Sequence, residues 1–400
     1  MKVARAIFGL LLAGLVSVGS ADPVREIQQR IDRGDVELSF DSRWGYLPAV
    51  LEAFDIPRSS QLLVFSKTSA QFQLISPRRP RAIYFNDSIY VGWVQHAPVL
   101  EISAVDRGVG AVFYTLHQIE EDRPQFIADN GSCLQCHESA KTLGVPGHLT
   151  RSVFPGPDGL PHYGLGTLNV DQSTPISERW GGWFITGEPP TPHRGNAVGT
   201  EEQVAGFEAG ALSRDPAEFF DPVDYLTPYS DPVAHLVLAH QTQVHNAMAK
   251  AGIEARAALA YRTEMTHIFG EPSMELQASV KRRIEGPAER LASQLLMLDE
   301  ALLPGSFVSS SGFAGDFEHA GKRDSDGQNL RELDLKTRVF RYPCSFLIQS
   351  EAFATLPRQT AEFVVQRMRK ALTSRVEADK GLESASDIDA CLSALDSAIN

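Results

Sequence analysis

The sequence AIYFNDSIYVGWV spans residues 82–94 and sets the architecture expected for the first half of the chain. Residues 82–85 and 89–94 are rich in β-branched and aromatic side chains, and the polar run Asn86-Asp87-Ser88 separates them. Two such runs on either side of a short polar turn are typical of antiparallel strands. The pattern therefore predicts a β-hairpin.

Further apolar runs extend this strand character on both sides of the hairpin. They cover residues 62–65, 99–102 and 111–114. An amphipathic pattern at residues 24–33 predicts one short helix ahead of them. We therefore expect a β-rich domain over residues 22–125.

The second half of the chain has helical patterns. Asp231-Pro232 is a typical helix start, and apolar residues then recur at helical spacing as far as Ala251. Further helices are expected at about 287–302, 357–377 and 386–399, with a Gly/Ser-rich loop at 304–330. The fold class that follows is α+β, with a β-rich N-terminal half, an irregular middle segment over 126–205 and a mostly helical region over 206–400.

The first 21 residues have the three parts of a secretory signal peptide. Lys2 and Arg5 give a positive start, an apolar run follows, and small residues end at Ala21. The apolar run is shorter than the roughly 20 residues of a membrane-spanning helix, and we expect no stable membrane span in the mature chain. We expect cleavage near Ala21 and a bacterial periplasmic or secreted location, with an uncleaved N-terminal anchor as the alternative.

The net charge limits the partners that the protein can have. The chain carries 37 Lys and Arg against 50 Asp and Glu, a formal charge of −13, and loss of residues 1–21 would leave −15. A surface of this sign is repelled by phosphate backbones and anionic lipids. We therefore expect no nucleic-acid partner, whereas a basic protein partner would suit the charge.

One motif indicates a cofactor. Cys133-Leu134-Gln135-Cys136-His137 has the C-x-x-C-H spacing of a c-type haem attachment sequence. In that chemistry each thiol adds across a porphyrin vinyl group, and the histidine that follows binds the iron. The motif predicts one covalent haem c on Cys133 and Cys136, with His137 as the proximal iron ligand, inside a haem-binding segment over 126–205.

The rival interpretations of the motif fit less well. A zinc site needs a second ligand pair at suitable spacing, which Cys344 and Cys391 do not supply. A thioredoxin-type pair opens a helix after a strand, whereas a turn-like stretch precedes this motif. Cys344 and Cys391 could form a disulfide in an oxidising compartment, or they could be two separate buried thiols.

Several segments together resemble a known family of large exported bacterial proteins that carry a single c-type haem domain and have no established activity. The resemblance covers nearly the whole mature chain and implies haem binding and little more. One departure is Ala239, where the family pattern has an acidic residue. The segments that carry it are 45–48, 61–68, 84–87, 90–93, 133–137, 145–148, 179–183, 193–196, 240–241, 245–246 and 341–345.

The second axial ligand of the iron decides what such a haem can do, because a second protein ligand suits electron transfer and an open position allows ligand chemistry. His148, eleven residues after His137, is the candidate distal ligand. His240, within the apolar stripe of the expected long helix, is the alternative, and His193, in a loop, is a weaker one. Each of these could instead be a hydrogen-bonded structural histidine, and Met248 is more typical of a core residue.

Other side chains in the same segment could contact a haem. Arg151, Arg179 and Arg194 could pair with its propionates, or they could be solvated surface arginines. Trp180 and Trp183 flank two glycines and could wall the haem, although any core would also accept them.

Two functions follow from these patterns. The first is periplasmic electron transfer to or from a redox partner protein, which the haem motif motivates directly. The second is a haem enzyme or small-ligand sensor, peroxidase-like, with an open iron position. A single haem needs much less protein than this chain provides, so the surplus residues must bind a partner, shield the haem or form a second site.

Overall fold

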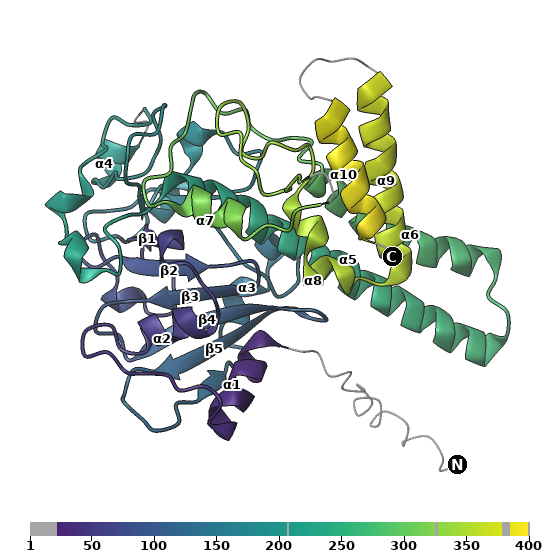
Figure 1. The fold of residues 1–400 in the computed structure, drawn as a ribbon, viewed down its shortest axis with the longest axis horizontal. Coiled ribbons are helices and arrows are strands. Elements are labelled where there is room, and N and C mark those ends of the chain that lie inside the picture. The colour runs from purple at the N-terminus through teal and green to yellow at the C-terminus, as the bar shows by residue number, and fades with distance from the viewer. Residues whose placement is uncertain (1–21, 206–207, 325–326, 378–384, 399–400) are drawn as a thin grey trace, which may run out of the picture.

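The computed structural model describes residues 22–205, 208–324, 327–377 and 385–398 (Figure 1). The expected signal peptide, residues 1–21, lies outside the described residues. The fold is α+β as expected. An antiparallel sheet of seven strands forms the basis of the N-terminal half, and the C-terminal half is helical.

The strands of the large sheet lie in the order β6-β5-β4-β3-β2-β1-β9. Their bounds are β1 Leu62–Val64, β2 Arg81–Phe85, β3 Ile89–Trp93, β4 Val99–Asp106, β5 Gly110–His117, β6 Phe126–Ala128 and β9 Trp183–Phe184. The predicted hairpin is confirmed as β2 and β3, whose turn is closed by Asn86 Oδ1 accepting from the amides of Ser88 and Ile89. A second, two-stranded sheet pairs β7 Arg151–Val153 with β8 Thr167–Asn169.

Strands β6 and β9 belong to the large sheet although they come from residues 126–205. The segment expected to be irregular therefore completes both edges of the sheet. The two-residue β9 pairs with β1 through Leu63 and Val64. The sequence pattern misses β9 because two residues are too few for an alternation to be recognised.

Both faces of the sheet are covered. One face packs on helices α1 (Pro23–Arg33) and α2 (Leu47–Ala53). The other face carries Tyr90, Ser103 and Phe113, which are cross-strand neighbours and so point the same way. Coverage on both sides explains why β3 is buried along its whole length instead of alternating.

Helix α5 (Pro232–Phe269) covers this second face. Its N-cap is Asp231, whose carboxylate accepts from the amides of Val233 and Ala234, as the sequence predicts. From Pro232 to Met248 every residue of the helix is buried. The single apolar stripe expected for this helix is therefore only part of its buried surface, and polar residues between the apolar ones are buried as well.

The remaining helices are α3 Leu134–His137, α4 Glu201–Val204, α6 Met274–Leu295, α7 Phe313–His319, α8 Glu351–Ala354, α9 Arg358–Glu377 and α10 Ala385–Ser397. The last two confirm the expected closing helices. The helix expected at 287–302 is wrong in its bounds, because α6 begins at Met274, continues through Pro287 and ends at Leu295. The loop expected at 304–330 contains α7, whose Phe313 and Phe317 insert into the core.

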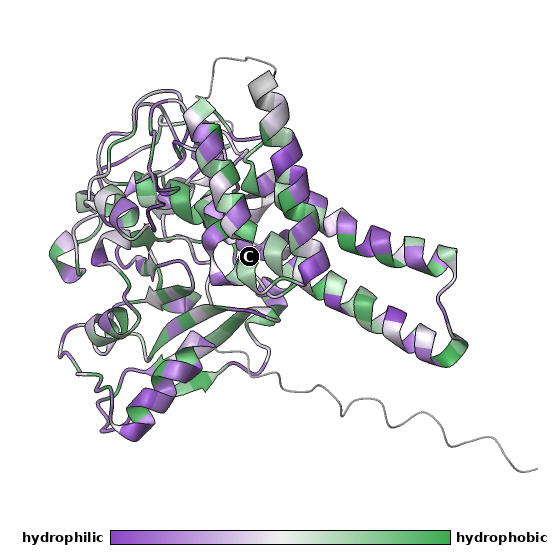
Figure 2. Cartoon of the chain, turned by 45° about the vertical axis from the view of Figure 1, so that its right-hand side comes forward, coloured by the Kyte–Doolittle hydropathy of each residue, from purple (hydrophilic) through white to green (hydrophobic). Residues whose placement is uncertain are grey.

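The outer parts of α5 and α6 run side by side beyond the body of the molecule (Figures 1 and 2). A small apolar cluster that includes Ala258 and Ile284 joins them. Among the helices in the described ranges, none combines the length and the apolar character that crossing a membrane requires.

Cys344 and Cys391 form a disulfide, with 6.0 Å between their Cα atoms. The bond joins the segment before α8 to helix α10. Both side chains are fully buried in the core shared by α5, α6 and α9. Of the two alternatives that the sequence leaves open, the structure has the disulfide.

Candidate haem-attachment site

The C-x-x-C-H motif lies in a short helical turn that one carboxylate organises. Cys133 is the N-cap of α3, and Asp129 accepts hydrogen bonds from the amides of Gly131 and Cys133 at 2.8 and 3.0 Å. Burial works to raise the pKa of Asp129, but the bonds donated by Ser132, Cys133 and Gly131 outweigh it and lower the pKa. The motif is therefore pre-folded around an ionised aspartate.

The two motif cysteines are free thiols and not a disulfide. Cys136 is exposed and Cys133 is half-buried. Burial, together with the neighbouring Asp129 charge, raises the pKa of Cys133 to about 11. A raised pKa disfavours the thiolate, and a thioredoxin-type redox nucleophile has the opposite shift.

His137 is held in one tautomer by a backbone carbonyl. Its Nδ1–H donates to Gly147 O at 2.8 Å, while the amide of Gly147 donates back to His137 O at 2.8 Å. Burial lowers the pKa of His137, although the bond to Gly147 opposes the shift. A neutral imidazole that donates from Nδ1 has its lone pair on Nε2, which is the form that binds a metal.

Helix α5 holds the carbonyl that orients His137. The side chain of Asn246 accepts from the amide of His148 at 2.9 Å and donates to the carbonyl of His148 at 2.8 Å. A Cβ at Gly147 would lie 2.2 Å from Asn246 Oδ1, so only glycine permits this approach. Asn246 thus holds the Gly147–His148 backbone by two hydrogen bonds, and the carbonyl of Gly147 orients the ring of His137, which is 109 residues before Asn246 in the sequence.

The motif packs on the second face of the sheet. The ring of Phe113 lies 4.8 Å from that of His137 and 6.3 Å from that of His148. His148 is bonded through Nε2 to Ser103 Oγ at 2.7 Å and packs on the ring of Tyr90 at 4.2 Å. Strands β3, β4 and β5 therefore supply one wall of the site.

Of the three distal-ligand candidates, only His148 lies near the motif. Burial, and then the neighbouring His245 and His137, lower its pKa well below the usual value. Because His148 directly follows Gly147, its backbone is on the Nδ1 side of the His137 ring, away from the Nε2 lone pair. To bind the iron, His148 would have to leave Ser103 and reach across to the other side of that ring.

The structure places His240 and His193 elsewhere. His240 Nδ1 is bonded to Gln172 Oε1 at 2.9 Å and its Nε2 to Ser345 Oγ at 2.7 Å, so both ring nitrogens are engaged. His193 Nδ1 accepts from the amide of Gly195 at 3.0 Å, and its ring packs on Trp180. Burial lowers the pKa of His240 to about 3 and that of His193 to about 4. Both behave as hydrogen-bonded structural histidines in this arrangement, and ligation by either remains an untested prediction.

Unsatisfied polar atoms cluster beside the motif. Arg81 and Glu101 form an ion pair at 2.5 Å on the second face of the sheet, and both influence the charge of His137. Arg81 Nε and Glu101 Oε1 are buried without a hydrogen-bond partner within the described part of the chain, and so are Arg151 Nε and Asn169 Oδ1. Asn169 also binds the carbonyl of Lys141, which is an electrostatic neighbour of Cys136 and Arg151. Buried polar atoms are rarely left unpaired, so these two donors and two acceptors leave hydrogen-bonding capacity beside the motif, although other atoms of the same kind lie elsewhere in the described chain.

The other predicted haem contacts divide into two kinds. Arg151 lies near Lys141, and one of its guanidinium nitrogens donates to Thr167 Oγ1. Its Nε has no hydrogen-bond partner in the described chain, so Arg151 stays a candidate for a propionate. Arg179 is buried and donates to the carbonyls of Thr174 and Gln172, and Arg194 lies over the ring of Phe154.

Trp180 and Trp183 are likewise engaged away from the motif sulfurs. Both are buried and both pack on the ring of His235. Trp183 Nε1 also donates to the carbonyl of Arg151 at 2.7 Å, so this indole supports the strand that carries Arg151. Their role in the structure is core packing.

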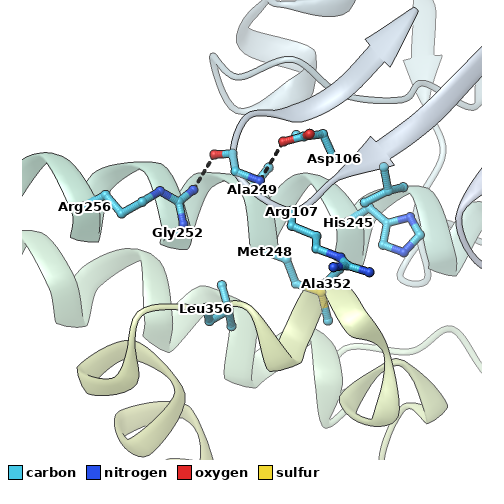
Figure 3. A pocket seen from close by; sticks show the side chains of 12 residues that line it. Asp106, Arg107, His245, Met248, Ala249, Gly252, Arg256, Ala352 and Leu356 are labelled. Atoms are coloured by element: carbon cyan, nitrogen blue, oxygen red, sulfur yellow. Dashed lines mark hydrogen bonds between the residues drawn. The ribbon is translucent and has the colours of Figure 1, made fainter. Parts of the chain in front are cut away.

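A small cleft lies between the β4–β5 hairpin, α5 and α8 (Figure 3). His245 and Met248 reach it from α5, and Arg256 donates across it to the carbonyl of Gly108. Its volume of about 20 Å³ has room for one water molecule and not for a macrocycle. The cleft beside His245 is therefore too small to be the haem pocket.

Sequence reasoning missed the residues that hold the motif in place. Asn246, Ser103, Phe113 and the Arg81–Glu101 pair were not predicted to act there. The available signal was the alternation of β4, which puts Glu101 and Ser103 on the same face of the strand as Val99 and Val105. Polar residues at such positions are unusual unless something on that face binds them.

Comparison with known proteins finds no match among protein-family models, curated proteins or solved structures. The resemblance that the motifs carry therefore stays a prediction.

Proposed function

We propose that this protein binds one haem c covalently through Cys133 and Cys136, with His137 on the iron, and that it transfers electrons in the bacterial periplasm. The observation that carries the proposal is that the motif has two free thiols and an oriented, neutral histidine. Two unpaired thiols stand at the right spacing beside a neutral imidazole whose Nδ1–H is already committed to a carbonyl. A free Nε2 lone pair is what the iron requires.

The surroundings of the motif support the same proposal. The orphaned donors Arg81 Nε and Arg151 Nε suit a prosthetic group that carries two carboxylates, whereas the acceptor Glu101 Oε1 does not. Arg151 and Lys141 would hold the propionates, since both are cationic, Lys141 lies near Cys136, and Arg151 lies near Lys141. When bound, the haem would supply the one-electron chemistry, and these residues would orient it and set its electrostatic environment.

A second candidate is a haem protein with an open iron position. Its support is the engagement of all three predicted distal histidines in hydrogen bonds elsewhere, with both nitrogens of His240 occupied. An open position would allow a small ligand or peroxide to bind. An acidic surface then serves either function, by attracting a basic redox partner or by keeping the protein soluble.

The test is expression with haem-maturation machinery, followed by spectra of the ferric and ferrous forms with and without carbon monoxide. Covalent haem should persist in denaturant in the wild-type protein and be lost in Cys133→Ala/Cys136→Ala. Cys344→Ala/Cys391→Ala is the matched control, because it removes two cysteines and should keep the haem. If the wild-type protein fails to mature while a control cytochrome succeeds, the proposal is wrong.

The same spectra separate the two candidates. Low-spin bands without a response to carbon monoxide indicate a second protein ligand and support electron transfer. High-spin ferric iron with rapid carbon monoxide binding supports the open site. His148→Ala changes the spin state only if His148 binds the iron.

A further inference from the structure

His117 lies at the end of β5, on the face of the sheet that carries the haem motif. Side chains alternate along a strand, so Phe113, Thr115 and His117 all point to this second face. Phe113 packs on the ring of His137 at 4.8 Å, and exposure increases from the half-buried Phe113 and Thr115 to the exposed His117. Strand β5 therefore leads from the motif to an exposed histidine.

The loop that orients His137 is anchored at the other end of β5. The amide of Ala111 donates to the carbonyl of Pro146 at 2.9 Å. A Cβ at Gly110 would lie 2.3 Å from the same carbonyl oxygen and 3.1 Å from the Cβ of Ala249 on α5. The loop and α5 thus cover the start of β5, where the β4–β5 turn meets α5 in Figure 3.

The lone pair of His137 points away from this loop. His137 donates from Nδ1 to the carbonyl of Gly147, so its free nitrogen is Nε2. Nε2 lies across the imidazole ring from that hydrogen bond, and a metal bound there is on the far side of the ring from the loop.

The neighbours of the motif histidine are arranged along the strands in the same order. His148, on the loop side, is bonded to Ser103, which pairs in the sheet with the phenylalanine that packs on the motif ring. Glu101 is a charged neighbour of the motif histidine and pairs with Thr115, two residues nearer the His117 end of β5. The lone pair, which points away from the loop, is thus directed to the Glu101–Thr115 side, and His117 lies beyond it.

The other exposed histidines lie elsewhere in the fold. Four of the 11 histidines are exposed: His96, His117, His267 and His319. His267 is in the last turn of α5 and His319 in that of α7, and His96 lies in the turn between β3 and β4. Within the described ranges the ring of His117 makes no hydrogen bond, whereas the three predicted distal candidates each make at least one. His117 can therefore turn to a metal without losing a contact.

We propose that His117 binds the haem iron on the side opposite His137. The inference rests on the proposed haem attachment and gives the iron two protein ligands, the arrangement that suits electron transfer. Phe113, which packs on the His137 ring, and His117 are about 14 Å apart along the strand at about 3.4 Å per residue, which leaves room for a macrocycle between the two imidazoles. Ile127 of β6 pairs with Thr115 and is 47% exposed, so it offers the macrocycle an apolar contact.

The experiment is expression of the wild-type protein, His117→Ala and His117→Met with haem-maturation machinery. Haem retained in denaturant reports attachment, and the ferric electron paramagnetic resonance spectrum reports the second ligand, as does carbon monoxide binding to the ferrous form. The wild-type protein should be low-spin. His117→Ala should keep its covalent haem, become high-spin and bind carbon monoxide, and added imidazole should restore the low-spin signal. His117→Met should stay low-spin with a raised midpoint potential, because methionine ligation raises it.

His96→Ala is the matched control, because it removes another exposed histidine near the same end of the sheet, and it should keep the low-spin spectrum. His117 is exposed, so its variants should fold. Covalent haem with an unchanged low-spin spectrum in His117→Ala, or a high-spin wild-type protein, would overturn the assignment of His117 and leave haem attachment intact. Absence of covalent haem in the wild-type protein would overturn the proposed function, and this inference with it.

Discussion

Removal of the Cys344–Cys391 disulfide should lower the free energy of unfolding by about 4 kcal/mol. The bond joins residues separated by 47 positions in the sequence. In the chain-entropy treatment, a cross-link that closes a loop of this length restricts the unfolded chain by about 4 kcal/mol at 25 °C. Both side chains are fully buried, so alanine is the better replacement, because a serine hydroxyl would remain unpaired in the core.

The assay is urea unfolding of the wild-type protein and of Cys344→Ala/Cys391→Ala, with the free energies extrapolated linearly to water. The same pair measured in reductant is the control, because the wild-type protein then loses its cross-link and the difference should shrink. Alkylation of the denatured, unreduced wild-type protein should leave Cys344 and Cys391 unmodified. A difference below about 1 kcal/mol, when about 4 is expected, would refute the reasoning.

Three further predictions concern the sheet face and the buried histidines. Arg81→Gln should lower and Glu101→Gln should raise the midpoint potential of attached haem in a redox titration, because positive charge favours the reduced iron; shifts of the same sign would contradict this placement of the pair. Gly92→Ala should cost roughly 1 kcal/mol in urea unfolding, because its Cβ would stand 2.1 Å from the Arg81 guanidinium, which can move aside only by weakening its ion pair with Glu101, whereas Gly286→Ala has open space and should be neutral or stabilising. Stability should also fall as the pH drops from 7 towards 4, because burial holds the pKa of His240 at about 3 while the unfolded chain takes up that proton near pH 6.5. Each such histidine contributes a slope of up to about 1.4 kcal/mol per pH unit, so His240→Gln should give a flatter stability–pH curve, and an unchanged curve would count against the buried neutral state.

The elements that sequence reasoning predicted well are those that local chemistry defines. The β2–β3 hairpin has a side chain in its turn that closes the turn by itself, and α5 has an aspartate cap followed by proline. The elements that it missed depend on distant contacts. Strand β9 has two residues and exists because β1 pairs with it. Helix α7 begins in a Gly/Ser-rich stretch and is held by Phe313 and Phe317 in the core.

The site divides in the same way. The spacing of Cys133, Cys136 and His137 is a property of five consecutive residues, so the haem prediction needs no tertiary information. The partners of the candidate distal ligands could not be predicted. His148, His240 and His193 each look available in the sequence, and in the structure each has a hydrogen bond that comes from a separate part of the chain or from its own loop.

By itself, the sequence determined the α+β class, the attachment motif, the charge, the approximate ends of α1, α9 and α10 and the start of α5, because caps, alternation and motif spacing act over a few residues. The tertiary structure alone decided that Asn246 of α5 places the carbonyl that orients His137, and that Cys344 pairs with Cys391. Those arrangements join residues that are distant in the chain, and they form only when the sheet and the helices bury a common core.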